Sequence, residues 1–251
     1  MSNAVEAIPA LQPGALAGRV ILVTGAHGGL GSEAAKACAQ AGATVVLLGR
    51  KLPKLNRVYD AVKVLGPEPA LYPMDLAGAD PADYEQLADK LAGELGGLHG
   101  VLHCAAEFKG LAPLEATAPE EFLRNLHVNL TAPWLLTQAC LPRLREQPDS
   151  AVVFVSDEPE RVGRAYWGAY GLAKLGVEHL TRMLHDETES GPVRVSCLRP
   201  GPMRSDIRSR AYVEEAASRC PSPALYAPAC VHLLSAAGSA QRGRIWAPRP
   251  S

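Results

Sequence analysis

The chain has 251 residues, of which 47% are hydrophobic, and a formal net charge of −1 at pH 7. A chain of this size can bury one large core, and its near-neutral charge gives no electrostatic reason to expect a nucleic-acid or membrane partner. No apolar run approaches the roughly 20 residues that span a bilayer, and the first residues carry no signal-peptide pattern.

Residues 1–18 are broken by prolines and glycines and predict an irregular arm ahead of one domain over 19–251. An aliphatic run at 20–23 predicts the first strand. It is followed by the glycine-rich turn Thr24-Gly-Ala-His-Gly-Gly-Leu-Gly31 and by a predicted helix over 32–41. Strand, glycine turn and helix together form the opening βα unit of a dinucleotide-binding site.

Three glycines of this turn have separate roles. Gly25 permits the tight turn, Gly29 lets the backbone approach a pyrophosphate, and Gly31 allows the helix to pack closely on the strand. Free N–H groups and the dipole at the start of the helix favour a phosphate there. The turn is therefore a candidate phosphate-binding loop.

Apolar segments alternate with helical patterns through the rest of the chain. Further strands are predicted at 44–48, 70–73, 101–104, 151–155, 193–198 and 244–247. Helices are predicted at 54–65, 81–95, 119–145 and 166–189. Asn129, Pro133 and Pro142 predict a kink or break in the third of these. The alternation implies a parallel sheet covered on both faces, an α/β doubly wound (Rossmann) fold of about seven strands. Ligands of such folds bind at the carboxyl ends of the strands, where strands 1 and 4 lie side by side.

The end of the second strand bears on the choice of cofactor. In many dinucleotide sites an acidic residue there binds the adenosine ribose, but this chain has Gly49 followed by Arg50. Without a carboxylate nothing repels a 2′-phosphate, and the Arg50 guanidinium can bind one, with help from Lys51. NADP(H) is therefore preferred, with NAD(H) as the alternative. In the other interpretation, Arg50 is a solvated residue that opens a loop.

Tyr170 and Lys174 form the sharpest chemical signal. Spaced four residues apart on a predicted helix, they share a face and can point into one cleft. A nearby ammonium favours the phenolate and lowers the phenol pKa from its ordinary value of about 10, which makes proton transfer feasible at neutral pH. Lysine can also hold the nicotinamide ribose. Such pairs also cover helix surfaces, so it is their place after the fifth strand that favours a catalytic role.

With these motifs the chain resembles the short-chain dehydrogenase/reductase family over about residues 18–247. The matching motifs are Thr24-Gly-x3-Gly-x-Gly31, Asp75, Asn129, Tyr170-x3-Lys174, and Pro200-Gly201 with Ser205. The resemblance implies an oxidoreductase that transfers a hydride between NADP(H) and a small-molecule alcohol or carbonyl substrate, with Tyr170 as acid/base. It also implies that two long helices pair across a two-fold axis in a homodimer or homotetramer.

The resemblance implies roles for residues outside the Tyr–Lys pair. Asn129 would order a water that relays protons to the lysine. Asp75 would meet the adenine amino group, or else only cap the next segment. Pro200-Gly201 with Ser205 would contact the nicotinamide carboxamide, or be an ordinary turn. The expected cofactor-binding residues are Gly25, His27, Gly28, Gly29, Leu30, Gly31, Arg50, Asp75, Leu76, Cys104, Ala105, Ala106, Tyr170, Lys174, Pro200, Gly201 and Ser205.

One departure from the family pattern follows the fourth strand. The family usually has Asn-Asn-Ala-Gly there, whereas this chain has His103-Cys104-Ala105-Ala106. That segment approaches the cofactor mainly through its backbone, so the changed side chains need not abolish binding. His103 and Cys104 have no second ligand cluster beside them, so we expect core packing and no metal site. The six cysteines contain no Cys-x2-Cys pair and predict reduced core residues of a cytoplasmic protein.

A second departure affects catalysis. The family's catalytic serine lies thirteen residues before the tyrosine; here that residue is Asp157, and Ser156 is its neighbour. A one-residue slip turns a side chain to the other face of a strand, so Ser156 could substitute only through a bulge. An ionised Asp157 cannot donate to a carbonyl and raises the pKa of Tyr170, whereas a protonated one could donate. The alternative function is therefore a dinucleotide-binding protein with impaired or no dehydrogenase turnover. The expected catalytic residues are Asn129, Ser156, Asp157, Tyr170 and Lys174.

Overall fold

In residues 6–250, which the computed structural model describes, seven strands form one parallel sheet. The strands are β1 Val20–Thr24, β2 Thr44–Gly49, β3 Ala70–Pro73, β4 Gly100–His103, β5 Ser150–Val155, β6 Val193–Leu198 and β7 Ile245–Trp246. Their order is β3-β2-β1-β4-β5-β6-β7. The predicted doubly wound fold is confirmed: β1 and β4 are neighbours, with Thr24 opposite His103 at their carboxyl ends.

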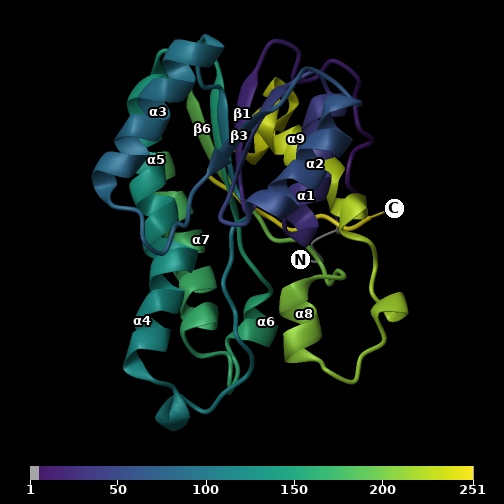
Figure 1. Ribbon diagram of the computed structural model, residues 1–251, viewed down its shortest axis with the longest axis vertical. Helices are drawn as coiled ribbons and strands as arrows, with labels where there is room; N and C mark the ends of the chain where they lie inside the picture. The colour runs from purple at the N-terminus through teal and green to yellow at the C-terminus, as the bar shows by residue number, and fades with distance from the viewer. Residues whose placement is uncertain (1–5, 251) are drawn as a thin grey trace.

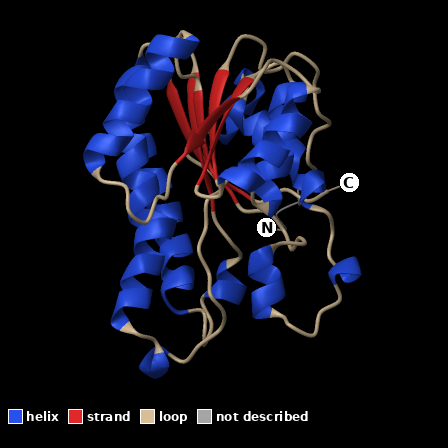
Figure 2. Cartoon of the chain, viewed as in Figure 1, coloured by secondary structure: helices blue, strands red, loops and turns tan. Residues whose placement is uncertain are grey.

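Helices cover both faces of the sheet. They are α1 Gly29–Gln40, α2 Leu52–Lys63, α3 Pro81–Leu95, α4 Pro119–Leu126, α5 Ala132–Arg145, α6 Pro159–Val162, α7 Gly168–Thr188, α8 Asp206–Ala211 and α9 Ala227–Leu234. One core cluster joins the sheet to α1, α2 and α9, and a second joins it to α3, α5 and α7. Figure 2 shows the sheet between the two layers, and Figure 1 shows α6 and α8 beyond one end of it. Because both faces are covered, β1 is buried along its whole length.

The predicted break in the long helix at 119–145 is confirmed. α4 ends at Leu126, a π-helical turn spans His127–Thr131, and α5 begins at Ala132. Pro133 is the second residue of α5, directly after the π-helical turn. Asn129 is the central residue of the π-helical turn. Such turns are frequent at functional sites.

Three helices differ from the prediction at their ends. The helix expected at 32–41 spans Gly29–Gln40. The helix expected at 166–189 spans Gly168–Thr188, because Tyr166 has a φ of 75°, which a right-handed helix does not admit. The helix expected at 54–65 spans Leu52–Lys63, with Pro53 in its first turn, where proline is favoured.

Residues 6–18 of the predicted arm pack on the domain. Leu16 is fully buried, and the backbone N–H of Ile8 donates to the carbonyl of Arg249 at 3.0 Å. Trp246 donates its Nε1–H to Glu6 at 2.6 Å, which ties the arm to β7. Residues 1–5 of the arm, and Ser251, lie outside the described residues. Within 6–250, no helix is long and apolar enough to cross a membrane.

Candidate active site

A cavity lies at the carboxyl ends of the central strands, where the segments that follow β1, β2, β4, β5 and β6 converge. Its walls include every residue predicted to bind the cofactor or to act in catalysis, except Asn129. Helix α8 also lines the cavity, through Asp206, Ile207, Arg208 and Arg210. The fold therefore brings the predicted residues together in one place.

In the turn after β1, two backbones come into contact. Gly25 has a φ of +61°, and a Cβ there would lie 2.6 Å from the Cα of Ala105. The backbone N–H of Ala105 donates to Oγ1 of Thr24 at 3.1 Å. Gly28, the N-cap of α1, has no side chain with which to bond the first N–H groups of that helix. Those N–H groups can therefore hold an anion such as a pyrophosphate.

Cationic side chains gather near the end of β2. Gly49 carries no carboxylate, and a Cβ on it would lie 2.5 Å from Nδ1 of His27, so a glycine is needed to make room for that imidazole. Arg50, Lys51 and Lys54 line the cavity and lie close enough to His27 to lower its pKa. This set of donors fits a dinucleotide with a phosphate on its adenosine side.

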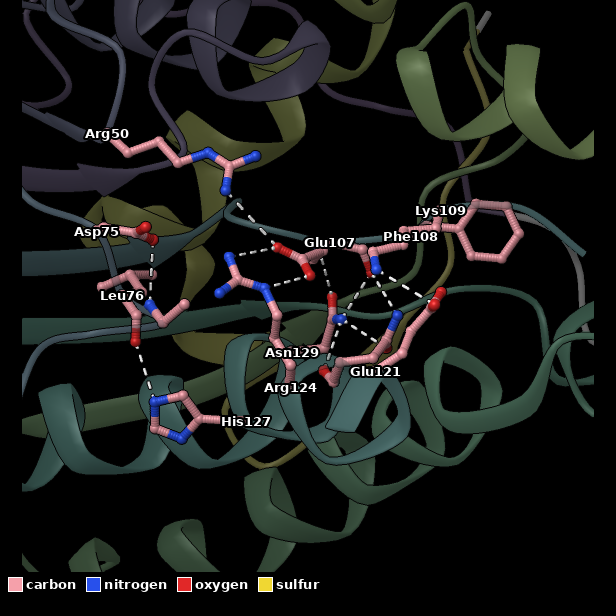
Figure 3. A network of polar contacts seen from close by, with 12 residues as sticks. Arg50, Asp75, Leu76, Glu107, Phe108, Lys109, Glu121, Arg124, His127 and Asn129 are labelled. Atoms are coloured by element: carbon pink, nitrogen blue, oxygen red, sulfur yellow. Dashed lines mark hydrogen bonds and ion pairs between the residues drawn. The ribbon is translucent and has the colours of Figure 1, made fainter. Parts of the chain in front are cut away.

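Arg50 is held by a carboxylate that the sequence analysis did not single out. Its Nη1 lies 3.7 Å from Oε2 of Glu107, whereas Arg124 binds both oxygens of Glu107 at 2.8 and 3.1 Å. Figure 3 shows Glu107 between the two arginines. The Glu107 side chain is only 13% exposed, against 46% for Arg50. The tighter pair is with Arg124, so Arg50 keeps the freedom to turn toward a ligand.

The segment after β3 also reaches this network (Figure 3). Asp75 lines the cavity, and its Oδ1 accepts the backbone N–H of Ala77 at 3.1 Å. A ring nitrogen of His127 bonds the carbonyl of Leu76 at 3.0 Å, which joins the π-helical turn to this segment. Asp75 thus caps a turn and also faces the cavity, and both predicted roles are compatible with its position.

The Asn129 side chain holds the loop that follows β4. Its Nδ2 donates to the carbonyl of Glu107 at 2.8 Å and to the carbonyl of Asn125 at 2.9 Å, and its Oδ1 accepts the backbone N–H of Glu107 at 3.2 Å. The residue is 1% exposed and does not line the cavity. Figure 3 shows its contacts with Glu107. In this geometry Asn129 acts on the site through the backbone of residue 107.

Tyr170 meets the carboxylate of Asp157, the residue predicted at the family's serine position. The Tyr170 hydroxyl donates to Oδ2 of Asp157 at 3.0 Å, and Oδ1 of Asp157 is ion-paired with Nη2 of Arg161 in α6. Arg161 also lies over the ring of Trp167, 5.2 Å from its centroid. Arg161 was not among the predicted site residues, although its spacing of four residues from Asp157 is a pattern that pairs opposite charges.

Burial and Asp157 set the ionisation of Tyr170. Burial is the largest cause that raises the pKa of Tyr170 well above 10.0; Asp157 adds to it and Arg161 opposes it. Burial also lowers the pKa of Lys174, whose Nζ donates to the carbonyl of Val155 at 2.9 Å. The expected lowering of the Tyr170 pKa by Lys174 is therefore wrong, whereas the expected raising of that pKa by Asp157 is confirmed.

Ser156 faces a different neighbour. Its hydroxyl donates to Oε1 of Glu178 in α7 at 2.8 Å, and Glu178 is in turn bound by Arg199 at 2.8 Å. The pairing of β5 with β6 continues without a bulge to Val155. No bulge therefore corrects the one-residue offset of Ser156 from the expected serine position, and Asp157 is the residue that contacts Tyr170.

Aromatic side chains pack near Tyr170 and in the core behind the cavity. Phe108 lies with its ring centroid 5.2 Å from that of Tyr170 and 5.1 Å from that of Trp167. His103 stacks on Phe154 at 4.8 Å, and burial lowers its pKa to about 3. The prediction that His103 packs in the core is confirmed. In the part of the chain that the structure describes, no three His, Cys, Asp or Glu side chains form a group that could hold a metal ion.

Comparisons with known proteins agree with this geometry. The family described as short chain dehydrogenase matches residues 19–216. The uncharacterized oxidoreductase YciK of Escherichia coli (strain K12) is 36% identical over 217 residues, which are 86% of this chain and 86% of that one.

Two solved structures are similar over nearly the whole chain. A short chain dehydrogenase from Pseudomonas syringae has a TM-score of 0.89 at 38% identity and covers 99% of both chains. One from Escherichia coli CFT073, described as complexed with NADPH, has a TM-score of 0.89 at 34% identity over 94% of this chain and 98% of that chain.

Proposed function

Because the chain belongs to the short chain dehydrogenase family, we propose that this oxidoreductase transfers a hydride between NADP(H) and an alcohol or carbonyl substrate. The observation that carries the proposal is the shared cavity of Tyr170, Lys174 and the glycine turn after β1. An acid/base group thus lies beside the place where a dinucleotide would be held. When bound, the nicotinamide supplies or accepts the hydride.

Tyr170 has the proton-transfer role in this proposal. In carbonyl reduction its hydroxyl donates a proton to the substrate oxygen, and in alcohol oxidation its phenolate accepts one. The raised pKa keeps the phenol protonated at neutral pH, which is the state that reduction requires. Lys174, whose Nζ lies 5.5 Å from the Tyr170 ring centroid, would hold the nicotinamide ribose. Asn129 would support the site by fixing the loop at Glu107.

The preference for NADP(H) is supported by the residues at the end of β2. Gly49 leaves that position without a carboxylate, and Arg50 offers a guanidinium at the rim of the cavity. The similar structure from Escherichia coli CFT073 is described as complexed with NADPH. Asp75, at the end of β3, would contact the adenine.

A second candidate function rests on Asp157. Oδ2 of Asp157 accepts a hydrogen bond from the Tyr170 hydroxyl at 3.0 Å. This carboxylate therefore competes with the substrate oxygen for the Tyr170 proton. A chain that binds the dinucleotide without transferring hydride would then act as a redox-sensing or structural partner. Both functions require cofactor binding, so only hydride transfer distinguishes them.

We further propose that the protein is cytoplasmic and forms a homodimer or homotetramer. Leu123 of α4 and Leu172 of α7 are 64% and 55% exposed, and Trp134 of α5 is 46% exposed. Large apolar side chains on neighbouring helices favour a second copy of the chain as partner over nucleic acid or membrane.

The test of hydride transfer uses NADPH deuterated at C4 with a panel of aldehydes and ketones. Mass spectrometry of the alcohol products should show transferred deuterium with the wild-type enzyme. Tyr170→Phe should remove the transfer and leave NADPH affinity nearly unchanged, because the phenol acts in the transition state. Tight NADPH binding with no transfer to any carbonyl would favour the second candidate.

A further inference from the structure

Helix α8 brings one arginine to the part of the cavity that holds Tyr170. The Arg210 guanidinium lines the cavity, and its Nη1 donates to the backbone carbonyl of Phe108. The ring centroid of Phe108 lies 5.2 Å from that of Tyr170. Ile207, three residues before Arg210, lies on the same face of α8 and packs against the cluster that contains Phe108 and Tyr170. This face of α8 is therefore turned toward the proposed proton donor.

Arg210 has no acidic partner among the described residues. Two other arginines of the cavity wall are neutralised: Arg161 is paired with Asp157, and Arg208 is bound by Glu215 at 2.7 Å. By contrast, no carboxylate in the described part of the chain forms an ion pair with Arg210. A carbonyl accepts from its Nη1 alone, so the N–H groups on Nε and Nη2 remain for a ligand.

The charge of Arg210 is separate from the cations at the end of β2. Those cations lie close enough to His27 in the glycine turn to lower its pKa, and Arg210 is not one of them. Asp206, the first residue of α8, also acts on the pKa of His27, in the opposite direction. The cavity therefore has one group of cations beside the expected cofactor phosphates and one further cation beside Phe108.

We propose that Arg210 binds a carboxylate of the substrate, so that the hydride acceptor is a carbonyl compound with an anionic end and an apolar body. This inference rests on the proposed function and names the substrate class of the same site. One guanidinium with adjacent N–H groups matches one carboxylate in charge and in geometry. Phe108 and Ile207 line the cavity and offer apolar contact to the part of the substrate between its carboxylate and its carbonyl.

The reaction that follows is the reduction of an oxo acid to a hydroxy acid. The carbonyl carbon takes up a hydride from NADPH, which leaves as NADP+, and the carbonyl oxygen takes up the proton of the Tyr170 hydroxyl. Tyr170 then regains a proton from solvent. Arg210 stays charged throughout, so its part is to bind and orient the substrate rather than to exchange a proton.

The ortho, meta and para isomers of acetylbenzoate, each compared with its methyl ester, test the inference. A ketone cannot accept a hydride from NADP+, so calorimetric titration of the NADP+-loaded protein measures binding alone. An acid whose length fits the site should bind roughly tenfold more tightly than its ester. Arg210→Gln should remove this advantage, and Arg210→Lys should keep part of it. Arg145→Gln removes an exposed charge of α5 outside the cavity and should match the wild type.

Turnover of the same compounds with NADPH separates this inference from the proposed function. Loss of the contact with Phe108 in Arg210→Gln would lower kcat/KM for acid and ester alike, so the acid-to-ester ratio is the quantity that reports the charge. That ratio should fall roughly tenfold.

The inference is overturned if none of the acids binds more tightly than its ester in the wild type, or if the advantage of the acid survives in Arg210→Gln. Reduction of the ketones by NADPH would in that case leave hydride transfer intact. Selective binding of an acid that depends on Arg210, without reduction of any ketone, would support the carboxylate site and count against hydride transfer.

Discussion

The hydroxyl of Tyr170 donates its hydrogen to Oδ2 of Asp157 across 3.0 Å in a place where both residues are less than a tenth exposed. A serine at residue 157 could donate to a substrate oxygen, whereas a carboxylate can only accept. Asp157 in turn is neutralised by Arg161 rather than by Lys174. A phenol, a carboxylate and a guanidinium are therefore in contact at this point of the cavity.

This contact predicts the pH dependence of alcohol oxidation. Oxidation requires the Tyr170 phenolate, and the pKa of Tyr170 is raised well above 10.0. The rate should therefore still be rising at the alkaline limit of enzyme stability, whereas reduction, which uses the neutral phenol, should not need high pH. Measuring kcat/KM for NADP+-dependent oxidation of an alcohol found in the panel across pH tests this. A plateau in the neutral range would contradict the assigned pKa direction.

Arg161→Ala should destabilise the fold. It would leave the Asp157 carboxylate, whose side chain is 10% exposed, without its charge partner. A loss of roughly 2–3 kcal/mol is expected in urea unfolding. Arg164→Ala, an exposed neighbour whose Nε donates to the carbonyl of Glu160, is the control and should cost less than about 0.5 kcal/mol.

The double variant Asp157→Ser/Arg161→Ala separates charge pairing from packing. Removal of the carboxylate should recover most of the stability lost in Arg161→Ala, because no buried charge is left unpaired. Arg161 also covers the ring of Trp167, so a smaller packing loss should remain. A loss in the double variant equal to the sum of the losses in Asp157→Ser and Arg161→Ala would show that Asp157 and Arg161 are not coupled.

Arg50→Ala should remove most of the preference for NADPH over NADH. A charge-assisted contact to phosphate contributes about 1.5–3 kcal/mol, a roughly tenfold to hundredfold preference. Arg57→Ala, exposed on α2 and outside the cavity, is the matched control. Calorimetric titration of each protein with both cofactors gives the ratio. NADH binding as tight as NADPH binding in the wild type would be incompatible with the proposed preference.

The exposed apolar side chains of α4, α5 and α7 predict self-association. Light scattering at micromolar concentration should show a dimer or tetramer, and Leu172→Glu should weaken it by placing a charge in the contact. Leu52→Glu, at a 46% exposed leucine of α2 in the opposite helix layer, should leave the assembly unchanged. A wild-type monomer would exclude this assembly.

Local pattern was sufficient to predict the sheet and its binding edge. The strand predicted at 193–198 is β6 to the residue, and in it apolar Val193, Val195 and Cys197 alternate with Arg194, Ser196 and Leu198. The spacing of Tyr170 and Lys174 placed both side chains on the cavity wall. The start of α7 could not be predicted, because Tyr166 has a positive φ, which is uncommon for a residue other than glycine.

Contacts between segments that are far apart in the chain could not be predicted from the sequence. Glu107 joins Arg50 after β2 to Arg124 in α4, and no periodicity pairs these three residues. Asn129 matched a family motif, yet its side-chain partners on residues 107 and 125 follow only from the π-helical turn. The ionisation of Tyr170 depended on burial, which residue types alone do not report.

Asp157→Ser tests the central claim most directly, with Ser156→Ala as its matched control. The substitution restores a hydroxyl donor and removes the carboxylate that binds the Tyr170 proton, so reductase turnover with NADPH should rise and the alkaline limb of oxidation should move to lower pH. Ser156→Ala should leave turnover nearly unchanged, because that hydroxyl bonds Glu178. If Asp157→Ser lowered activity at every pH while Ser156→Ala had no effect, Asp157 would be a required catalytic residue, and its limiting role would be contradicted.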